Sequence, residues 1–287
     1  MIVNGPNGTV IQGNLIGTDP SGTAARANGQ NGVYIWAGSQ NTVVGGTSTA
    51  ARNVISGNTN DGIDLNGVTN TTVQGNYVGV DVNGSAAKAN GGNGVALFNA
   101  ANSNTVGGTG AGARNVVSGN AFDGIYLGGV SNNLVQGNYV GVNSAGTSTI
   151  GNGSVGVDIL GGSQINIVGG NVSAARNIIG GSVAYDVAVA GSGTTGNVIL
   201  GNYIGLDATG LIGLAMNNTG VAVYNGAQSN VIGGTSGGSR NFISGHGTYG
   251  LFIADTGTSN NLVQGNTIGL NAASVAVPNT GPWYCVF

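Results

Sequence analysis

The sequence predicts an all-β solenoid, and a long internal repeat is the first observation behind this prediction. The segment ARNVISGNTNDGIDLNGVTNTTVQGNYVG, residues 51–79, recurs along the chain. Its Arg-Asn pair recurs at intervals of 62, 62 and 64 residues, beginning at Arg52, Arg114, Arg176 and Arg240. Units repeated at a fixed period are typical of solenoids, whose turns stack along one axis. We therefore expect one domain over residues 1–287, built of about nine turns.

A shorter repeat lies inside the long one and defines the single turn. A small residue is followed by apolar, any and apolar residues, as in GVYI, GIDL and GVAL, every 30 to 34 residues. The small residues are Gly32, Gly62, Gly94, Gly124, Gly156, Asp186, Gly220 and Gly250. The long unit is therefore a pair of turns, one with the loop GTSTAAR before its last strand and one with the loop NGSAAKANGGN after it.

Composition and alternation favour strands over helices in each turn. Gly fills 59 of 287 positions, which is incompatible with many helices. Short alternating segments rich in Val and Ile, bounded by Gly, Asn, Asp and Ser, are typical of strands between tight turns. Stacked turns would pair these strands in parallel, ~4.8 Å apart. In the GVYI strand, Val33 and Ile35 should point inward and Tyr34 and Trp36 outward.

Other repeated positions are predicted to form the interior. Ile63, Leu65, Val73 and Val78, with their copies, are expected to be core residues. Asparagines that recur every second turn are expected to satisfy backbone groups of the turns: Asn53, Asn115, Asn177 and Asn241.

Composition also excludes several classes of protein. Only 5% of residues are charged, and six Lys and Arg stand against nine Asp and no Glu. Nucleic-acid binding is disfavoured because it needs a basic stripe. Cys285 is the sole cysteine, so no intrachain disulfide can form. No apolar run is long enough to span a membrane, and residues 1–10 do not resemble a signal peptide.

The segments ARNVISGN, DGIDLNG, NTTVQGN and GNYVGVD resemble the right-handed parallel β-helix repeat. More narrowly, they resemble the repeats of long secreted bacterial surface proteins. The resemblance implies a secreted or cell-surface protein, with its export signal outside this chain, and a polysaccharide or cell-surface glycan as partner. Proteins of this fold include adhesive stalks, carbohydrate-binding proteins, lyases and glycoside hydrolases, so the fold leaves the activity open.

An outward face with aromatic and acidic residues is the predicted glycan-binding strip. Aromatic rings stack on sugars, and carboxylates bind hydroxyl groups. The predicted carbohydrate-binding residues are Tyr34, Trp36, Phe98, Tyr126, Asp158 and Tyr224. The alternative is that these aromatic residues only suit exposed strand positions.

Three aspartates are the catalytic candidates, because glycoside hydrolysis needs two carboxylates within about 5 to 9.5 Å. Asp61 and Asp64 share a turn, and Asp123 lies two turns, or ~9.6 Å, from Asp61. The structural alternative is that Asp61 and Asp123, each before Gly, form turns. A lyase is less favoured than a hydrolase, because the arginine that a lyase would use as base recurs in every unit and so should hold the loop.

Further columns have structural interpretations. Leu15, Tyr77, Tyr139, Tyr203 and Thr267 either form rungs for a polymer or, as we favour, pack beside the loops. No cofactor is expected, although a turn column with interchanging Asp and Asn could bind calcium weakly: Asp19, Asp81, Asn143, Asp207 and Asn271.

His246 and the chain ends complete the expectations. His246 is the only histidine, lacks the partners of a zinc site, and is expected to be a solvated turn residue. The ends match points inside the repeat, so open ends could associate end to end, or residues 283–287 (WYCVF) could fold over as an aromatic plug.

Two functions therefore remain. The first is a polysaccharide-binding module or adhesive stalk. The second is a glycoside hydrolase that uses Asp64 with Asp61 or Asp123. An ice-binding face is disfavoured, because the threonines occur in loops of alternate turns.

Overall fold

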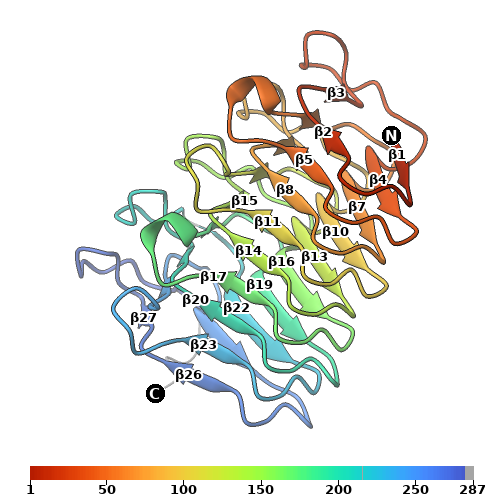
Figure 1. The fold of residues 1–287 in the computed structure, drawn as a ribbon. Helices are drawn as coiled ribbons and strands as arrows, with labels where there is room; N and C mark the ends of the chain where they lie inside the picture. Colours follow the sequence, from red (N-terminus) through yellow and green to blue (C-terminus); the bar gives the residue numbers. More distant parts are fainter. Residues whose placement is uncertain (215, 282–287) are drawn as a thin grey trace.

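The chain folds into a rod of three parallel β-sheets wound as a right-handed helix (Figure 1). The computed structural model describes residues 1–214 and 216–281. Within them, each sheet has nine strands, and each turn adds one strand to each sheet. This confirms the predicted solenoid, with about eight full turns separating the first and last strands of a sheet. The predicted plug, with Cys285, lies outside the described residues.

Sheet I carries the GVYI-type strands. Its strands, in spatial order, are β1 (Ile2–Asn4), β4 (Val33–Trp36), β7 (Ile63–Asn66), β10 (Val95–Phe98), β13 (Ile125–Gly128), β16 (Val155–Leu160), β19 (Tyr185–Ala190), β22 (Thr219–Tyr224) and β25 (Leu251–Ile253).

Sheet II follows sheet I within each turn. Its strands are β2 (Val10–Ile11), β5 (Val43–Gly45), β8 (Thr72–Gln74), β11 (Thr105–Gly107), β14 (Leu134–Gln136), β17 (Ile167–Gly169), β20 (Val198–Leu200), β23 (Val231–Gly233) and β26 (Leu262–Gln264). Short 3₁₀ helices, Thr49–Ala51 and Ser173–Ala175, follow β5 and β17.

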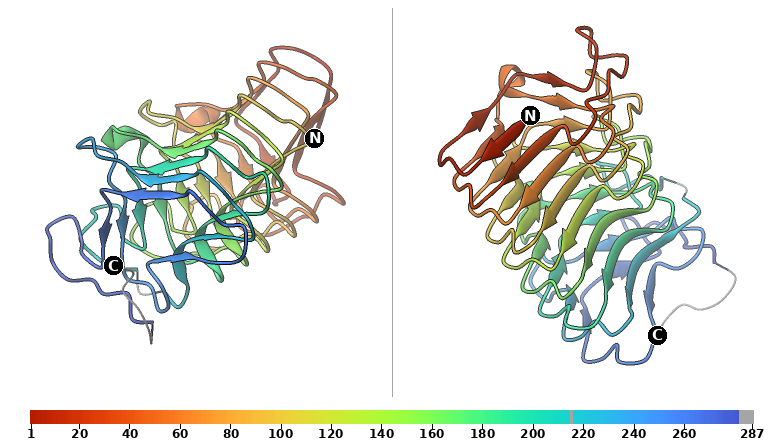
Figure 2. Two further views of the ribbon diagram at one scale, coloured as in Figure 1. Left: turned by 90° about the horizontal axis from the view of Figure 1, so that it is seen from below. Right: turned by 90° about the vertical axis from the view of Figure 1, so that its right-hand side faces the viewer.

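Sheet III closes each turn. Its strands are β3 (Leu15–Ile16), β6 (Val54–Ile55), β9 (Tyr77–Val78), β12 (Val116–Val117), β15 (Tyr139–Val140), β18 (Ile178–Ile179), β21 (Tyr203–Ile204), β24 (Phe242–Ile243) and β27 (Thr267–Ile268). Figure 2 shows the turns stacked along the rod, with loops projecting beyond the sheets.

The interior is a continuous apolar column, as predicted. Ile63, Leu65, Val73 and Val78 are all fully buried. Alternation along each strand points one side chain inward and the next outward, so each turn supplies apolar residues from all three sheets to one core. Burying one such side chain contributes about 1.5 to 3 kcal/mol, and the contribution recurs every turn.

An asparagine ladder runs along the interior of the corner between sheets II and III. Asn53 donates from Nδ2 to Oδ1 of Asn76 (2.9 Å), which in turn donates to Asn115 (3.0 Å). The same bonds continue through Asn138, Asn177, Asn202, Asn241 and Asn266. As predicted, Asn53, Asn115, Asn177 and Asn241 recur every second turn and donate to backbone carbonyl groups, as Asn53 does to Ile11 (2.8 Å). The asparagines that fill the turns between them were missed. The Arg-Asn and Gly-Asn motifs both end immediately before a sheet III strand, so they alternate in one column and fill every turn.

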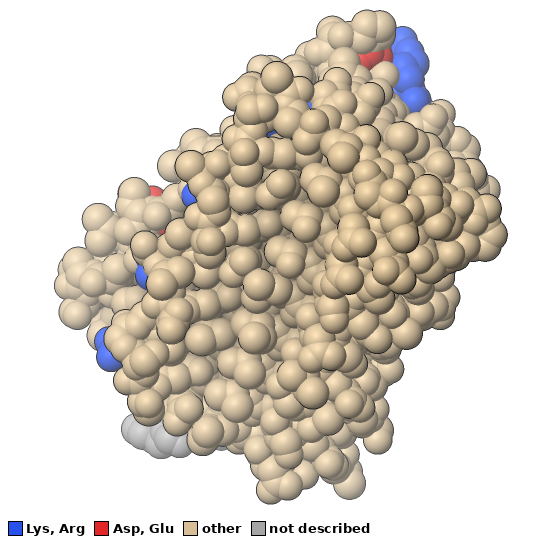
Figure 3. All heavy atoms as spheres, in the orientation of Figure 1, with Lys and Arg blue, Asp and Glu red and all other residues tan. Residues whose placement is uncertain are grey.

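Charged side chains are sparse on the surface, and the view in Figure 3 shows the basic ones along one edge and at one end of the rod. Over the part of the chain that the structure describes, no helix is long and apolar enough to cross a membrane.

Candidate functional site: the outer face of sheet I

The outer face of sheet I carries the row of residues that the repeat predicts. The strand register aligns Tyr34 with Asp64, Asp64 with Ala96, Ala96 with Tyr126, and Tyr126 with Asp158. The row continues through Ala188, Ala222 and Phe252. Column counting therefore gave the correct neighbours along this face.

Aromatic rings pair along this face from one end of the rod to the other. Four pairs have ring centroids 5.0 to 5.8 Å apart: Tyr34 with Trp36, Phe98 with Tyr126, Tyr185 with Tyr224, and Tyr249 with Phe252. The first pair is nearly parallel, with 9° between its planes, and Trp36 is 39% exposed. We call these eight residues the aromatic strip.

The ring of Tyr126 lies across the sheet instead of projecting from it. A Cβ added to Gly128 would come within 2.4 Å of Cε1 of Tyr126, so this ring covers the Gly128 backbone. Ala96, Ala188 and Ala222 hold outward positions of the row and are nevertheless fully buried. The strip is therefore a low, half-buried apolar surface whose ring faces are held in place by their neighbours.

Tyr185 and Tyr249 were missed by the sequence interpretation. Each stands one residue before the small residue of its turn, outside the strand positions from which the outward columns were counted. The side chain of Tyr185 nevertheless reaches the ring of Tyr224 in the next turn. The signal that could have found both is the tyrosine directly before the small residue in two turns that lie one long repeat, 64 residues, apart.

Asp64 and Asp158 are the two carboxylates of the row, and both are more buried than an open strip implies. Asp64 is 8% exposed and accepts a 2.9 Å hydrogen bond from Nδ2 of Asn31. The Oδ1 atoms of Asp64 and Asp158 are buried and have no hydrogen-bond partner among the described residues. Burial raises the pKa of each carboxyl group to about 7, and the charges of Asp61 and Asp123, respectively, add to the shift.

Asp61 and Asp123 have structural roles in the turn before sheet I. Oδ1 of Asp61 accepts a 2.6 Å hydrogen bond from the backbone N–H of Asn93, and Oδ1 of Asp123 accepts one of 2.9 Å from Val155. Each carboxylate thus fastens its own turn to the next. Burial raises the pKa of both groups, and the charge of Asp123 raises that of Asp61 further.

Four acidic groups influence one another on this face. The charge of Asp61 raises the pKa of Asp64, and the charge of Asp123 raises those of Asp158 and Asp61. From the sequence, Asp158 was assigned to the glycan-binding strip and was not linked with Asp123. The two residues lie on neighbouring turns, not in one GIDL-type segment, so the link was not evident in the sequence.

The charges of Asp158 and Asp123 act on two tyrosines of the strip. The pKa of Tyr126 is raised, first by burial and then by the charges of Asp158 and Asp123. The pKa of Tyr224 is raised to about 12 by burial, Asp158, Tyr185 and further acidic groups. The middle of the aromatic strip therefore combines a protonatable carboxyl group with phenol hydroxyls that donate hydrogen bonds at any physiological pH.

The tyrosines of sheet III pack beside the loops, as favoured from the sequence. The Arg52 guanidinium lies 4.1 Å from the ring centroid of Tyr77, and Tyr139 and Tyr203 are similarly covered by Arg114 and Arg176. Tyr139 and Tyr203 are 6% and 7% exposed, which rules out their use as rungs for a polymer.

The turn column with interchanging Asp and Asn bonds to its own loops. Oδ1 of Asp81 accepts hydrogen bonds from the backbone N–H groups of Ser85 (2.8 Å) and Ala86 (3.1 Å). Within the described residues no three His, Cys, Asp or Glu side chains cluster as metal ligands.

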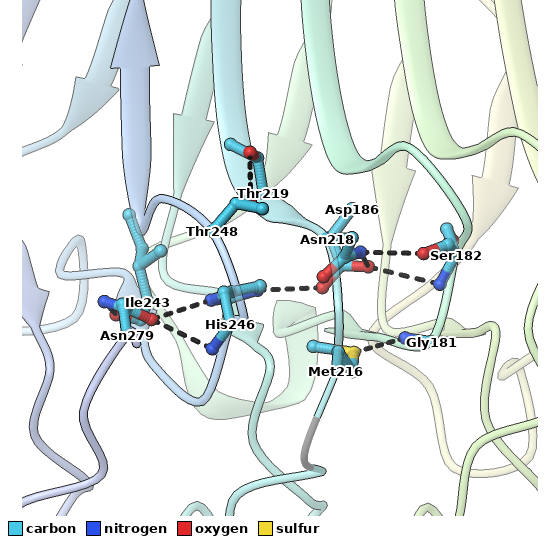
Figure 4. A network of polar contacts seen from close by, with 10 residues as sticks. All are labelled: Gly181, Ser182, Asp186, Met216, Asn218, Thr219, Ile243, His246, Thr248 and Asn279. Atoms are coloured by element: carbon cyan, nitrogen blue, oxygen red, sulfur yellow. Dashed lines mark hydrogen bonds and ion pairs between the residues drawn. The ribbon is translucent and has the colours of Figure 1, made fainter. Parts of the chain in front are cut away.

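The prediction that His246 is a solvated turn residue is wrong. It is 1% exposed, and its Nε2 lies 3.0 Å from Oδ2 of Asp186, while Nδ1 lies 3.0 Å from Oδ1 of Asn279 (Figure 4). The physical reason is that its column is a second buried asparagine ladder, which runs through Asn28, Asn58, Asn90, Asn120 and Asn152. A residue in that column is enclosed by the next turn.

Comparisons with known proteins give the fold. No protein-family model matches the sequence, and no curated protein matches it either. The chain has the parallel β-helix fold. It is similar to the A-module of the Azotobacter vinelandii mannuronan C-5 epimerase AlgE4, with 17% identity, a TM-score of 0.50, and coverage of 90% of this chain and 66% of that one.

Two further solved structures are similar. For the AlgE6 A-module from Azotobacter vinelandii, the identity is 18%, the TM-score 0.47, and the coverage 88% of this chain and 68% of that one. For the periplasmic alginate epimerase AlgG, the identity is 16%, the TM-score 0.47, and the coverage 93% of this chain and 46% of that one. The chain thus spans about half the length of AlgG. At such identities the likeness concerns the fold alone.

Proposed function

We propose that this protein binds an extended polysaccharide along the outer face of sheet I, outside the cell or on its surface. The observation that carries the proposal is the aromatic strip, in which four ring pairs follow one face of the rod. Aromatic faces stack on the C–H faces of sugar rings, and a row of them suits a linear chain. AlgE4, which has the same fold, is by its name an enzyme of the polysaccharide mannuronan.

The charge of the face favours a neutral polymer. No strand of sheet I contains Lys or Arg, whereas Asp64 and Asp158 lie in its outward row. Both carboxyl groups have a pKa of about 7 and are therefore partly ionised at neutral pH, where they would repel a uronate chain. When protonated, they can donate hydrogen bonds to sugar hydroxyl groups.

Affinity electrophoresis in gels containing neutral or acidic polysaccharides tests this proposal. We expect retardation by at least one neutral polymer and its loss in Tyr126→Ala and Trp36→Ala. Leu211→Ala, which removes a 48% exposed apolar side chain from the loop after β21, is the matched control and should migrate like the parent chain. Retardation that survives both strip variants would contradict the proposed face.

A glycoside hydrolase is the second candidate, because Asp64 and Asp158 each have a pKa of about 7, raised first by burial and then by the charge of a second carboxylate, Asp61 or Asp123. Such a carboxyl group and the second carboxylate resemble the general acid and its partner in glycoside hydrolysis. Size profiles of neutral polysaccharides after long incubation test this reading. Shortened chains that stay intact with Asp64→Asn or Asp158→Asn would support hydrolysis, and unchanged profiles across the panel would leave binding alone.

A further inference from the structure

A row of four arginines follows the corner between sheets II and III, away from the aromatic strip. Each stands two residues before a sheet III strand, and two turns separate neighbouring members, or ~9.6 Å. Figure 3 shows basic side chains recurring along one long edge of the rod. The members of this arginine row are Arg52, Arg114, Arg176 and Arg240.

The guanidinium groups of the first three members are held in place by the next turn. Arg52, Arg114 and Arg176 lie 4.0 to 4.1 Å from the ring centroids of the tyrosines below them. Nε of Arg52 also donates to the carbonyl oxygen of Gly75 (3.3 Å), and Nε of Arg176 to that of Gly201 (3.1 Å). The orientation of these groups is therefore fixed before any ligand arrives, which lowers the entropic cost of binding.

Their charge is not neutralised within the described part of the chain. Among the described residues, one pair of oppositely charged residue types lies within 4 Å, namely Asp186 with His246. No carboxylate there is therefore within 4 Å of a guanidinium group of the row. The terminal nitrogens of the four arginines donate no hydrogen bond to a described residue. Asp81 and Asp207, in loops that follow sheet III strands, accept hydrogen bonds from their own loops.

A cavity opens between the first two members of the row. It has a volume of about 320 Å³ and is lined by Arg52, Arg114, Tyr77, Ser144 and the loop 108–112. The loop comes close because its glycines lack side chains; a Cβ on Gly112 would lie 1.9 Å from the carbonyl oxygen of Thr47. Two cationic groups thus face one hollow large enough for a sugar carboxylate or sulfate.

We propose that the arginine row is a second binding site, specific for an acidic polysaccharide with one anionic group on every second sugar. The cavity between Arg52 and Arg114 would take one such group by charge-assisted, bidentate hydrogen bonds. The repeat of two turns, ~9.6 Å, is close to the length of a disaccharide, so further anionic groups of the same chain would meet Arg176 and Arg240. Several weak contacts on one polymer give high combined affinity.

Binding of hyaluronan, which has one carboxylate per disaccharide, tests the proposal by calorimetry on the full chain at low salt. We expect binding that weakens steeply with added salt and that strengthens from short to long oligosaccharides. The variant Arg114→Gln/Arg176→Gln should bind at least tenfold more weakly. The control Arg26→Gln/Lys88→Gln removes the same charge outside the row and should stay within about twofold of the parent chain.

The opposite outcomes would overturn the site. If the row variant and the control lose hyaluronan affinity equally, the binding is general charge attraction without a defined site. If free glucuronate binds as tightly as the polymer, the four arginines do not act together on one chain. If the Gln variant is unfolded by circular dichroism, Arg114→Lys/Arg176→Lys keeps the charge. It should bind about threefold or more weakly, because lysine cannot form the bidentate contact; parental affinity would contradict the proposal.

The experiments test this site and the proposed function separately. Tyr126→Ala should leave hyaluronan binding unchanged, because the aromatic strip is on another side of the rod. Arg114→Gln/Arg176→Gln should leave retardation by neutral polymers unchanged. A loss of hyaluronan binding in Tyr126→Ala would assign the acidic polymer to sheet I instead of the arginine row.

Discussion

Oδ2 of Asp186 lies 3.0 Å from Nε2 of His246, and this polar contact joins two turns of the rod with both side chains fully enclosed. In most other turns the position of Asp186 is glycine, because the next asparagine of the ladder fills the space: a Cβ on Gly62 would lie 2.8 Å from Nδ2 of Asn90. After Asp186, the ladder position is Met216, whose sulfur contacts the backbone N–H of Gly181 instead. The vacated space accommodates the carboxylate.

Removing one member of this pair should destabilise the rod strongly. Oδ1 of Asp186 accepts from Asn218 (2.8 Å), and Oδ2 depends on His246. In His246→Asn the side chain of Asp186 stays buried and loses this partner, at a cost of about 3 kcal/mol. The urea midpoint measures the loss, and an unchanged midpoint would contradict a structural role for this contact.

A double variant separates the contribution of this contact from that of its surroundings. Asp186→Gly/His246→Asn restores the residue types that other turns have at these two positions, so it leaves neither partner of the contact unpaired. We expect it to be more stable than His246→Asn alone, with a coupling energy of about 1 to 3 kcal/mol. Additive losses in the double-mutant cycle would show that the two residues act independently.

The asparagine ladder should add substantially to the free energy of unfolding in every turn. Asn115 accepts from the backbone and side-chain nitrogens of Asn76 and donates to Val73 and Asn138, all at 2.8 to 3.0 Å. In Asn115→Ala these buried groups lose their partners, which costs about 3 kcal/mol. Asn60→Ala, at an exposed position with one hydrogen bond, is the control and should change the unfolding midpoint little.

The inward assignment of sheet I is tested at Ile63, which is fully buried. Ile63→Asp would place an unpaired charge in the apolar core, so we expect loss of cooperative melting by far-UV circular dichroism. Ile165→Asp is the matched control, because Ile165 is 56% exposed and has a φ of 56°, which aspartate adopts more readily. Similar melting of the two variants would argue against the core position.

The fold could be predicted from the sequence because a repeat reports the register directly. Once the period was known, Tyr34, Asp64, Ala96 and Tyr126 had to be neighbours, and they are. Whether the residues at one repeated position are exposed or buried depends instead on whether the next turn covers them. His246 was misjudged for this reason, since nothing in its local sequence distinguishes an exposed turn from a buried ladder.

The candidate site was predicted less completely than the fold. The members of the aromatic strip in the outward row followed from alternation, whereas Tyr185 joins it through the length and direction of its side chain. The pairing of Asp123 with Asp158 depends on a diagonal between turns, which column counting does not measure. Side-chain reach across strands is thus what the sequence left undetermined.

The carboxyl groups of Asp64 and Asp158 should make stability depend on pH between about 4 and 8. Their pKa is about 7 in the folded chain, mainly through burial, against ~3.9 in an unfolded chain. Between these values the folded state binds more protons than the unfolded state, so the free energy of unfolding falls as pH rises. Asp19 and Asp81, whose pKa is lowered chiefly by hydrogen bonds, act below about pH 4, where stability is lost as pH falls.

Urea midpoints at pH 5 and pH 8 measure this effect. The parent chain should be less stable at pH 8 than at pH 5, and Asp64→Asn/Asp158→Asn should show a smaller difference, because an amide does not ionise. Asp19→Asn is the control and should keep the parental difference, since the group it removes titrates outside this range. If the double variant keeps the full difference, the two carboxyl groups are already ionised at pH 5, and the hydrolase reading loses its general acid.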